Sequence, residues 1–190
     1  GKYLSALPGT IKELRSLLKN LNCRKILYGP VVSAGTQLEG GKISEKIDKK
    51  TFDELLKECF YDYNEIADFA IKGASIAKQI PWPKMIEIET GSGCIMGKCS
   101  FCTEPLKAKV KWREQKDIHK EIKTFYDQGE RNFRLGKQAC FFSYKNCDVE
   151  EMKKLLKPIG RGSSLKLNCL HIDNIIPSLV NEERTKVVVK

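Results

Sequence analysis

The chain has 190 residues, of which 41% are hydrophobic and 31% are charged, and its formal net charge is +10 at pH 7. This length suffices to bury a sizeable core, and no apolar run approaches the roughly 18 residues of a membrane span, so we expect a globular protein without membrane contact. The positive charge favours anionic partners such as RNA, although lysines mixed with glutamates are also typical of a solvated surface.

The cysteine content indicates a reducing compartment. The N-terminal stretch lacks the apolar core of a signal peptide, and the chain contains 8 cysteines. In a non-secreted chain of this size, cysteines are reduced thiols or metal ligands more often than disulfides. We therefore expect a cytoplasmic protein.

The first third of the chain is expected to be α/β. Thr10 and Glu13 have capping-box spacing before leucines at helical intervals, which predicts a helix over residues 10–21. The stretch KILYG, residues 25–29, is typical of a short buried strand that ends at a Gly-Pro pair.

Two further helices are expected before the middle of the chain. Residues 31–50 are rich in glycine and charge and suggest a loop, whereas Thr51 and Glu54 repeat the capping-box spacing and predict a helix. The next helix, at about 64–78, carries an apolar side formed by Ile66, Phe69, Ala70 and Ile76.

Pro81 and Pro83 end helical structure and mark the expected domain boundary. We assign residues 1–84 to an N-terminal α/β region with a helical linker, and residues 85–190 to a second region. Strands are expected there at 85–90, 132–136 and 165–170, with helices at 115–128 and 148–157. Strands that alternate with helices imply a parallel sheet with its chemistry at the carboxyl ends of the strands.

The stretch from Cys94 to Cys102 directly follows the first strand of this second region and has the spacing C-x₄-C-x₂-C with Cys99. Thiolates this close in sequence are suited to an iron–sulfur cluster. Three neighbouring glycines, Gly91, Gly93 and Gly97, would let the backbone fold tightly. Three ligands on a four-iron cluster leave one iron open to a substrate or cofactor.

Other interpretations of the cysteines remain open. A plant-type [2Fe-2S] protein has the same spacing with a distant fourth ligand, for which Cys140 and Cys147 are candidates. A zinc site could pair Cys99 and Cys102 with the same two residues. The isolated cysteines, Cys23, Cys59 and Cys169, are expected to be small buried apolar residues.

Polar residues elsewhere are weaker candidates. His171, Asp173 and Asn174 follow the expected third strand and either bind a ligand or form an ordinary turn. In an extended chain, one face of KAKVKWR would carry a basic stripe of Lys107, Lys109, Lys111 and Arg113, either for phosphates or simply solvated. Glu87 and Glu89 alternate with isoleucines on the first strand of the second region.

The block IEIETGSGCIMGKCSFCTE, followed by DIHKEIKTFYDQGERNFRLGKQ, resembles the radical S-adenosylmethionine (radical SAM) superfamily. GKYLSALPGTIKELRSLL and KILYGP are similar to the end of the cobalamin-domain-like N-terminal region of archaeal members. The superfamily spacing is C-x₃-C-x₂-C, so this chain has one additional residue. The resemblance implies a partial Rossmann-like segment followed by the first three βα units of a partial TIM barrel.

The resemblance also implies a cofactor set. Cys94, Cys99 and Cys102 would hold a [4Fe-4S] cluster whose open iron binds S-adenosyl-L-methionine (SAM), and an external one-electron reductant would start its cleavage to a 5′-deoxyadenosyl radical. Phe101 matches the aromatic residue beside the adenine. Gly136, Lys137 and Gln138 fall on the glycine-glycine-acid motif that holds the SAM amino group, with Gln138 in place of the acid, and His171 and Asp173 are further candidate contacts.

Only three βα units fit after residue 85, whereas a complete barrel takes about 250 residues. We therefore interpret the sequence as a fragment whose exposed strand edge and apolar face need the missing barrel half or a covering partner. The cobalamin-like region is truncated as well, and for that reason we do not assign cobalamin. The substrate is left open.

Overall fold

The computed structural model describes residues 11–29, 31–32, 36–37, 43–45, 47, 50–56, 62–81, 84–99, 102, 104 and 109–189. The chain divides into two compact units, one of Gly1–Phe60 with Cys99–Lys107 and the other of Tyr61–Lys98 with Ala108–Lys190. This division lies upstream of the sequence-based boundary at residue 84, because the helix after residue 62 packs with the second unit. Within the described residues, we find no helix with the length and apolar character needed to span a bilayer.

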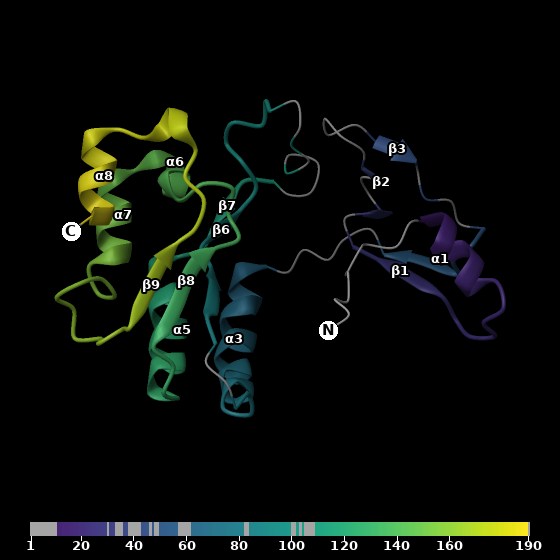
Figure 1. The fold of residues 1–190 in the computed structure, drawn as a ribbon, viewed down its shortest axis with the longest axis horizontal. Coiled ribbons are helices and arrows are strands. Elements are labelled where there is room, and N and C mark those ends of the chain that lie inside the picture. Colours follow the sequence, from purple (N-terminus) through teal and green to yellow (C-terminus); the bar gives the residue numbers. More distant parts are fainter. Residues whose placement is uncertain are drawn as a thin grey trace, which may run out of the picture. The chain divides into compact units, whose positions relative to one another are not determined.

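Among its described residues, the first unit includes helix α1 and four short strands (Figure 1). Helix α1 (Ile11–Leu18) confirms the first predicted helix. The strands are β1 (Ile26–Tyr28), which pairs in parallel with β4 (Glu54–Leu56), and β2 (Thr36–Gln37), which pairs antiparallel with β3 (Ile43–Glu45).

Two sequence predictions for this unit are wrong. The second capping box does not begin a helix, because the main chain of Asp53 instead donates to Lys25 O at 2.8 Å and starts the pairing of β4 with β1. The Asp53 carboxylate reinforces that pairing by accepting from Lys25 N at 2.6 Å. Strand β1 is also less buried than expected, with Ile26 48% and Tyr28 59% exposed, since a two-stranded sheet has little surface to cover them.

The second unit is an α/β structure around a parallel sheet. Its main helices are α3 (Tyr63–Ala77), α5 (Gln115–Asp127), α7 (Val149–Leu156) and α8 (Glu182–Val189), with shorter turns at η2 (Phe141–Ser143), α6 (Tyr144–Cys147) and η3 (Pro177–Leu179). Strands β5 (Ile86–Glu89), β8 (Asn132–Gly136) and β9 (Cys169–Ile172) form the sheet in that order, all parallel. The predicted α/β class with a parallel sheet is therefore confirmed.

Local signals explain where these helices begin and end. Asp62 and Asp148 cap α3 and α7 by accepting hydrogen bonds from main-chain amides in the first turn. After α5, Gly129 has a φ of 100°, a left-handed conformation that favours glycine. The third strand is displaced: it covers Cys169–Ile172 rather than residues 165–170, so His171 lies within β9 and not after it.

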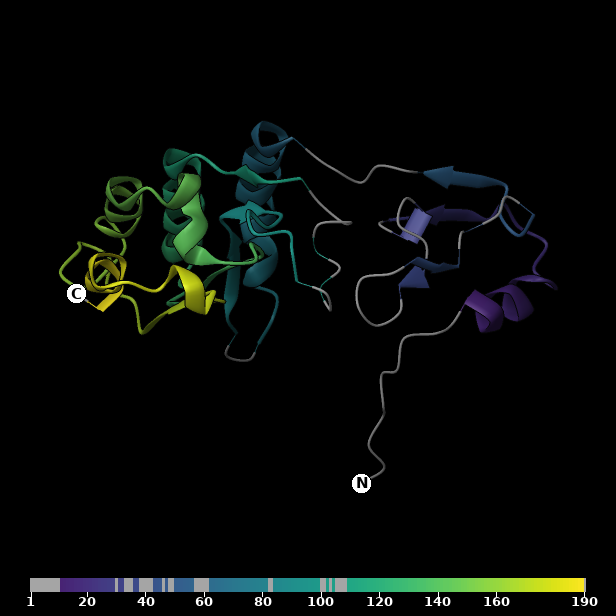
Figure 2. The same ribbon diagram turned by 90° about the horizontal axis from the view of Figure 1, so that it is seen from above.

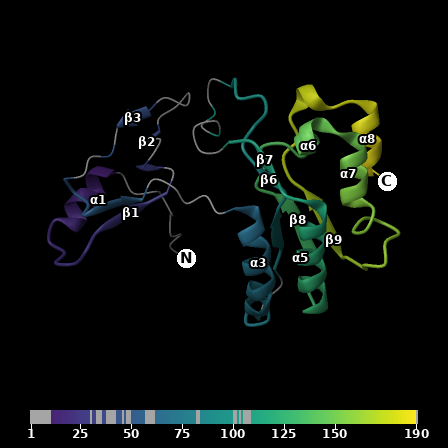
Figure 3. The ribbon, with the colours of Figure 1, turned by 180° about the vertical axis from the view of Figure 1, so that it is seen from behind.

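The two faces of the sheet differ in chemistry. Ile88, Phe133 and Leu135 are fully buried against the helices, in a core that also contains Ile118 and Ile122 of α5, and Met152 and Leu155 of α7. Figures 2 and 3 show α3, α5 and α7 on this same side of the strands. Burial of each such side chain contributes roughly 1.5–3 kcal/mol. Helices therefore cover the apolar face of these three strands.

The apolar side predicted for α3 is buried only in part, since Ile66 and Ala70 are half-buried. Ala74 and Ala77 are the buried residues of this helix, whereas Phe69 is 72% and Ile76 60% exposed. Small side chains allow α3 to approach its neighbour α5 closely, and this packing decides the orientation of the helix. The larger apolar side chains are left on the outside.

A buried ion pair connects β7 (Lys111–Trp112) to α5. Arg113, 1% exposed, donates from Nη1 to Glu121 Oε2 at 2.6 Å. Arg113 therefore does not belong to an exposed basic stripe, which corrects the sequence interpretation. Burial raises the pKa of Glu121 above its ordinary 4.5, although Arg113 opposes the shift. The contribution of this carboxyl to stability therefore falls as the pH rises through and above 4.5.

Replacing Glu121 by alanine should destabilise the chain by about 3 kcal/mol, because Arg113 would be left as an unpaired buried cation. Urea unfolding at pH 7 measures the effect. Asp127→Ala removes one partner of an exposed pair with Lys123 on the same helix and should cost under about 1 kcal/mol. The double variant Arg113→Met and Glu121→Met should recover most of the lost stability. Equal losses of stability in Glu121→Ala and Asp127→Ala would contradict the role of Glu121 as the partner of the buried Arg113.

Candidate functional site

The cysteine segment leaves the sheet at the carboxyl end of β5 and is closed at its base by two short strands. β6 (Gly91–Ser92) pairs antiparallel with β7, with Gly91 opposite Trp112 and Ser92 opposite Lys111. Strand β6 begins two residues after β5 ends, and Gly93 and Cys94 follow it directly. The structure therefore positions the start of the cysteine segment, including Cys94, at the edge of the sheet where α/β proteins carry their chemistry.

Glycines allow the segments around β6 and β7, at the base of the cysteine loop, to approach each other closely. Gly93 has a φ of 75°, and a Cβ atom on it would lie 2.7 Å from Lys109 O. A Cβ on Gly91 would lie 2.7 Å from Lys111 O, and Gly97 has a φ of 56°. The prediction that these glycines allow a tight backbone is confirmed.

The three cysteines of the motif are all free thiols. Cys94 is half-buried, Cys99 is exposed, and Cys102 is half-buried. Cys102 N donates to Cys99 O at 3.2 Å, so these two residues are the ends of a single turn. Cys94 belongs to the second compact unit and the other two to the first. Phe101 lies outside the described residues.

We tested whether these residues suit a metal centre. In the part of the chain that the structure describes, no three His, Cys, Asp or Glu side chains are gathered closely enough to hold a metal ion. The donor chemistry nevertheless fits a thiolate-ligated cluster, since none of the three thiols is in a disulfide and none is fully buried. One sulfur already accepts a hydrogen bond from the main chain, Glu104 N to Cys102 Sγ at 3.4 Å.

The segment after β8 lies directly beside the loop base. Gly136 is in register with Glu89, the last residue of β5, and Lys137 has a left-handed φ of 70°. Gln138 is only 4% exposed, and its Oε1 lies 3.5 Å from the position of a Cβ on Gly91. Among the described residues, neither its Oε1 nor its Nε2 has a hydrogen-bond partner. A buried amide without partners is unfavourable by about 1–3 kcal/mol, so this side chain is suited to a ligand.

The face of the sheet opposite the helices carries a polar row. Glu87, Arg134 and His171 stand in register on neighbouring strands, and Arg134 Nη2 donates to Asp173 Oδ1 at 2.6 Å. The glycine at 136 leaves room here, because a Cβ would lie 2.8 Å from Glu87 Oε1 and 3.3 Å from Asp173 Oδ2. Two carboxylates and a guanidinium therefore converge at the carboxyl end of β8. Asp173 is in this cluster, and His171, which is exposed, is in its row.

Sequence reasoning missed Arg134, and it placed Arg113 in an exposed basic stripe rather than in the buried pair with Glu121. The alternation of Phe133, Arg134 and Leu135 within the predicted strand already indicated that the arginine faces away from the core. For Arg113 no such signal existed, because Glu121 lies on a different element and the pairing depends on the fold.

The remaining cysteines do not extend the motif in the described residues. Cys140 is 1% exposed, and its Sγ accepts from Ile176 N at 3.2 Å, so this thiol is committed to the core. Cys147 and Cys169 are half-buried. Cys23 is exposed, which contradicts its predicted burial. Cys59 lies outside the described residues.

Gly93→Ala should loosen the base of the cysteine loop, because alanine is unfavourable by roughly 1–2 kcal/mol at a left-handed φ and would also collide with Lys109 O. Hydrogen exchange of the β6 and β7 amides should become about tenfold faster. The matched control is Gly73→Ala on α3, where a Cβ has open space, and exchange in β6 and β7 should stay unchanged. No change in the Gly93 variant would contradict the close approach.

These features define an α/β protein in which a cysteine loop begins at the carboxyl edge of a parallel sheet. No family model matches the chain. The chain is 38% identical over 231 residues to an uncharacterized protein of Methanocaldococcus jannaschii, covering 100% of this chain and 42% of that protein. It is 36% identical over 199 residues to an uncharacterized protein of Archaeoglobus fulgidus, covering 96% and 36%. The chain thus spans less than half the length of these relatives.

Proposed function

We propose that this chain is the N-terminal portion of a radical SAM enzyme. Cys94, Cys99 and Cys102 hold a [4Fe-4S] cluster by three of its irons, and SAM binds at the fourth. When bound, this pair supplies one-electron reductive cleavage of the SAM sulfonium to a 5′-deoxyadenosyl radical. The substrate remains unassigned, and an external reductant delivers the electron.

The buried amide of Gln138 is the observation that carries this proposal. It has no partner among the described residues and lies beside Gly91, three positions before Cys94. Its Oε1 can accept a hydrogen bond from an ammonium group, as the matching position does in the superfamily. An amide that lacks protein partners at this edge supports the presence of a bound polar group.

The other residues at this edge have assigned roles. The left-handed turn of Lys137 redirects the chain after Gly136 and points it toward the loop base. Asp173, fixed by Arg134, and His171 present polar groups for SAM or the substrate. Phe101 is proposed to lie against the adenine on the basis of the sequence motif alone.

The fold assignment rests on the order of the parallel strands. Neighbouring strands β5, β8 and β9 follow their order in the sequence with helices between them, as the first three units of a barrel would. We propose that a further barrel half or a partner covers the exposed polar face, and that the first unit derives from a Rossmann-like, cobalamin-domain-like region. No cobalamin is assigned, and free thiols support a cytoplasmic location.

The alternative functions make a different demand on Cys140. A zinc site would need both this thiol and Cys147, and a [2Fe-2S] site would need one of the two. Cys140 is in the hydrophobic core, whereas Cys147 is half-buried. Extracting Cys140 would disrupt packing around η2. A three-ligand centre requires no such change.

Anaerobic reconstitution with iron and sulfide should yield about four irons per chain, and its EPR signal should change when SAM is added. Cys99→Ala should lose the cluster, whereas Cys169→Ala, at a half-buried cysteine of β9, should keep the iron content of the unaltered chain. Two irons without a SAM response would favour an electron-transfer protein, and stoichiometric zinc without iron would favour a zinc module. Equal iron loss in both variants would refute the ligand assignment.

Gln138→Ala should weaken SAM binding to the reconstituted protein about tenfold, the effect of losing one hydrogen bond to a charged group. Iron content should not change, because the glutamine is not a cluster ligand. Equilibrium binding of SAM measures the effect, with Gln79→Ala at an exposed position as the control. Unchanged affinity in the Gln138 variant would remove the main support for the SAM site.

A further inference from the structure

Arg113 is bonded to both segments that border the candidate site. It follows β7 directly, and only 1% of it is exposed. Its main-chain N donates to Thr90 O at 3.0 Å, and its Nη1 donates to Glu89 O at 3.0 Å. Its main-chain O accepts from the Tyr144 hydroxyl at 2.8 Å, and Glu121 of α5 accepts from the same guanidinium. One buried residue therefore joins the carboxyl end of β5 to α5 and α6.

On the β5 side, these contacts fix the segment that leads to Cys94. Thr90 is fully buried, and only three residues separate it from Cys94. Two of those residues form β6, which pairs with β7 just before Arg113. The side chain of Glu89 is held as well, because Tyr63 OH of α3 donates to its Oε1 at 3.0 Å. A shift of Arg113 would therefore be passed on to Cys94.

On the other side, the contact with Tyr144 reaches the segment after β8. This segment carries Gln138 and continues through the fully buried Tyr144 toward α7. Burial raises the pKa of Tyr144 above its ordinary 10.0, so its hydroxyl remains a donor to Arg113 at neutral pH. The next residue, Lys145, forms an ion pair with Glu114, the neighbour of Arg113. Both contacts hold the Gln138 segment against the chain that leads from β7 into α5.

The segment after β8 also contains a strained turn. Lys145, Asn146 and Cys147 have φ values of 46°, 61° and 67°. This left-handed conformation is unfavourable for every residue with a side chain. Such backbone persists only where surrounding contacts fix it. The hydrogen bond of Tyr144 and the ion pair of Lys145 are contacts of this kind.

The burial of Arg113 is poorly explained by stability. Its Nε and Nη2 have no hydrogen-bond partner among the described residues. A buried ion pair adds little net stability compared with apolar side chains of similar size, and unpartnered donors are a further cost. What the guanidinium provides instead is a bond to Glu89 O, which an apolar side chain could not make. Positioning is therefore the role that its contacts support.

We propose that Arg113 is a positioning residue that fixes the segment carrying Cys94 relative to the segment carrying Gln138. The proposal rests on the proposed function, in which Cys94 is a cluster ligand and Gln138 accepts from SAM. Arg113 acts through the end of β5 on one side and through Tyr144 on the other. Iron uptake requires only the thiols and should not depend on this positioning. SAM binding requires the cluster and Gln138 together, and it should.

Tyr144→Phe removes the bond to Arg113 O and keeps the buried ring. In the reconstituted protein, SAM affinity should fall about tenfold, as in Gln138→Ala, because a displaced Gln138 loses the same hydrogen bond. Iron content should not change. The double variant Tyr144→Phe and Gln138→Ala should show no further loss, since both changes remove one interaction. Unchanged affinity in Tyr144→Phe, or additive losses in the double variant, would overturn the proposal.

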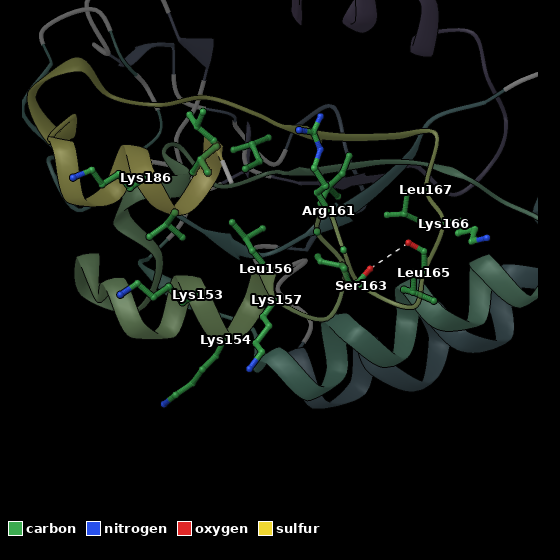
Figure 4. A pocket seen from close by; sticks show the side chains of 18 of the residues that line it. Lys153, Lys154, Leu156, Lys157, Arg161, Ser163, Leu165, Lys166, Leu167 and Lys186 are labelled. Atoms are coloured by element: carbon green, nitrogen blue, oxygen red, sulfur yellow. Dashed lines mark hydrogen bonds between the residues drawn. The ribbon is translucent and has the colours of Figure 1, made fainter.

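Two hydroxyl deletions elsewhere in the unit are controls for Tyr144→Phe. Tyr126→Phe removes the hydroxyl that accepts from Lys166 N at 3.3 Å. Ser163→Ala removes a donor to Leu165 O at 3.2 Å, a bond that Figure 4 shows in a separate cleft beside β9. Both variants should bind SAM with normal affinity. A loss in either control as large as that in Tyr144→Phe would contradict the proposed positioning.

The double variant Arg113→Met and Glu121→Met tests the positioning without cofactors. In the unreconstituted chain, hydrogen exchange of the amides of residues 92–94 should become about tenfold faster, although most of the stability is retained. The matched control replaces both partners of another largely buried pair by methionine: Lys84 Nζ lies 2.8 Å from Glu130 Oε1, and these side chains are 18% and 11% exposed. Exchange of residues 92–94 should stay normal in this control. Equal exchange in the two double variants would refute the role of Arg113.

Failure of the positioning and failure of the proposed function give different results. If the unaltered chain binds neither a cluster nor SAM, the proposed function fails and the positioning proposal fails with it. If the unaltered chain binds both, and Tyr144→Phe binds SAM equally well, only the positioning proposal fails.

Discussion

The main chain at the carboxyl end of β5 is fixed by hydrogen bonds that converge on Glu89 and Thr90, and the placement of the cysteine loop depends on them. Thr90 N donates to Gly136 O at 3.2 Å, and Arg113 N donates to Thr90 O at 3.0 Å. The Arg113 guanidinium adds a bond to Glu89 O at 3.0 Å. To reach that carbonyl, the guanidinium must be buried, and a buried cation needs the carboxylate of Glu121. An interaction in the helix layer thus sets the starting point of the loop on the sheet edge.

The two faces of the sheet differ in role: one packs against the helices, and the other carries the polar row of Glu87, Arg134 and His171. Because side chains alternate along a strand, Phe133 and Leu135 stabilise the unit through the helix side, while Arg134 between them remains on the polar side. The same alternation in β5 places Ile88 in the core and Glu87 in the polar row. The polar row can therefore vary in sequence without disturbing the core.

Much of the fold could be predicted because its signals are local. Helical periodicity and alternating strands placed α3, α5, α7, β5 and β8 to within a few residues. The failures share one cause, competition from residues distant in sequence. Glu54 has the spacing of a helix cap, yet Lys25 pairs with Asp53 and imposes a strand, and Arg113 looks like part of a basic stripe until Glu121 is brought to it.

The sequence predicts individual residues of the candidate site, but it does not predict how they are packed and hydrogen-bonded. The sequence indicates the thiols because their spacing carries chemical meaning by itself, whereas the segment after β8 is indicated only by the resemblance to the radical SAM superfamily. It does not indicate that Gln138 is buried without a partner, since burial and hydrogen bonding of an amide are properties of packing. That arrangement combines two unfavourable features at adjacent positions, the left-handed Lys137 and the unpartnered Gln138. Unfavourable local features that persist in a well-packed unit concentrate at functional sites, where a ligand offsets their cost. The end of β8 is therefore a position at which a bound ligand would offset such costs, and it adjoins the base of the cysteine loop.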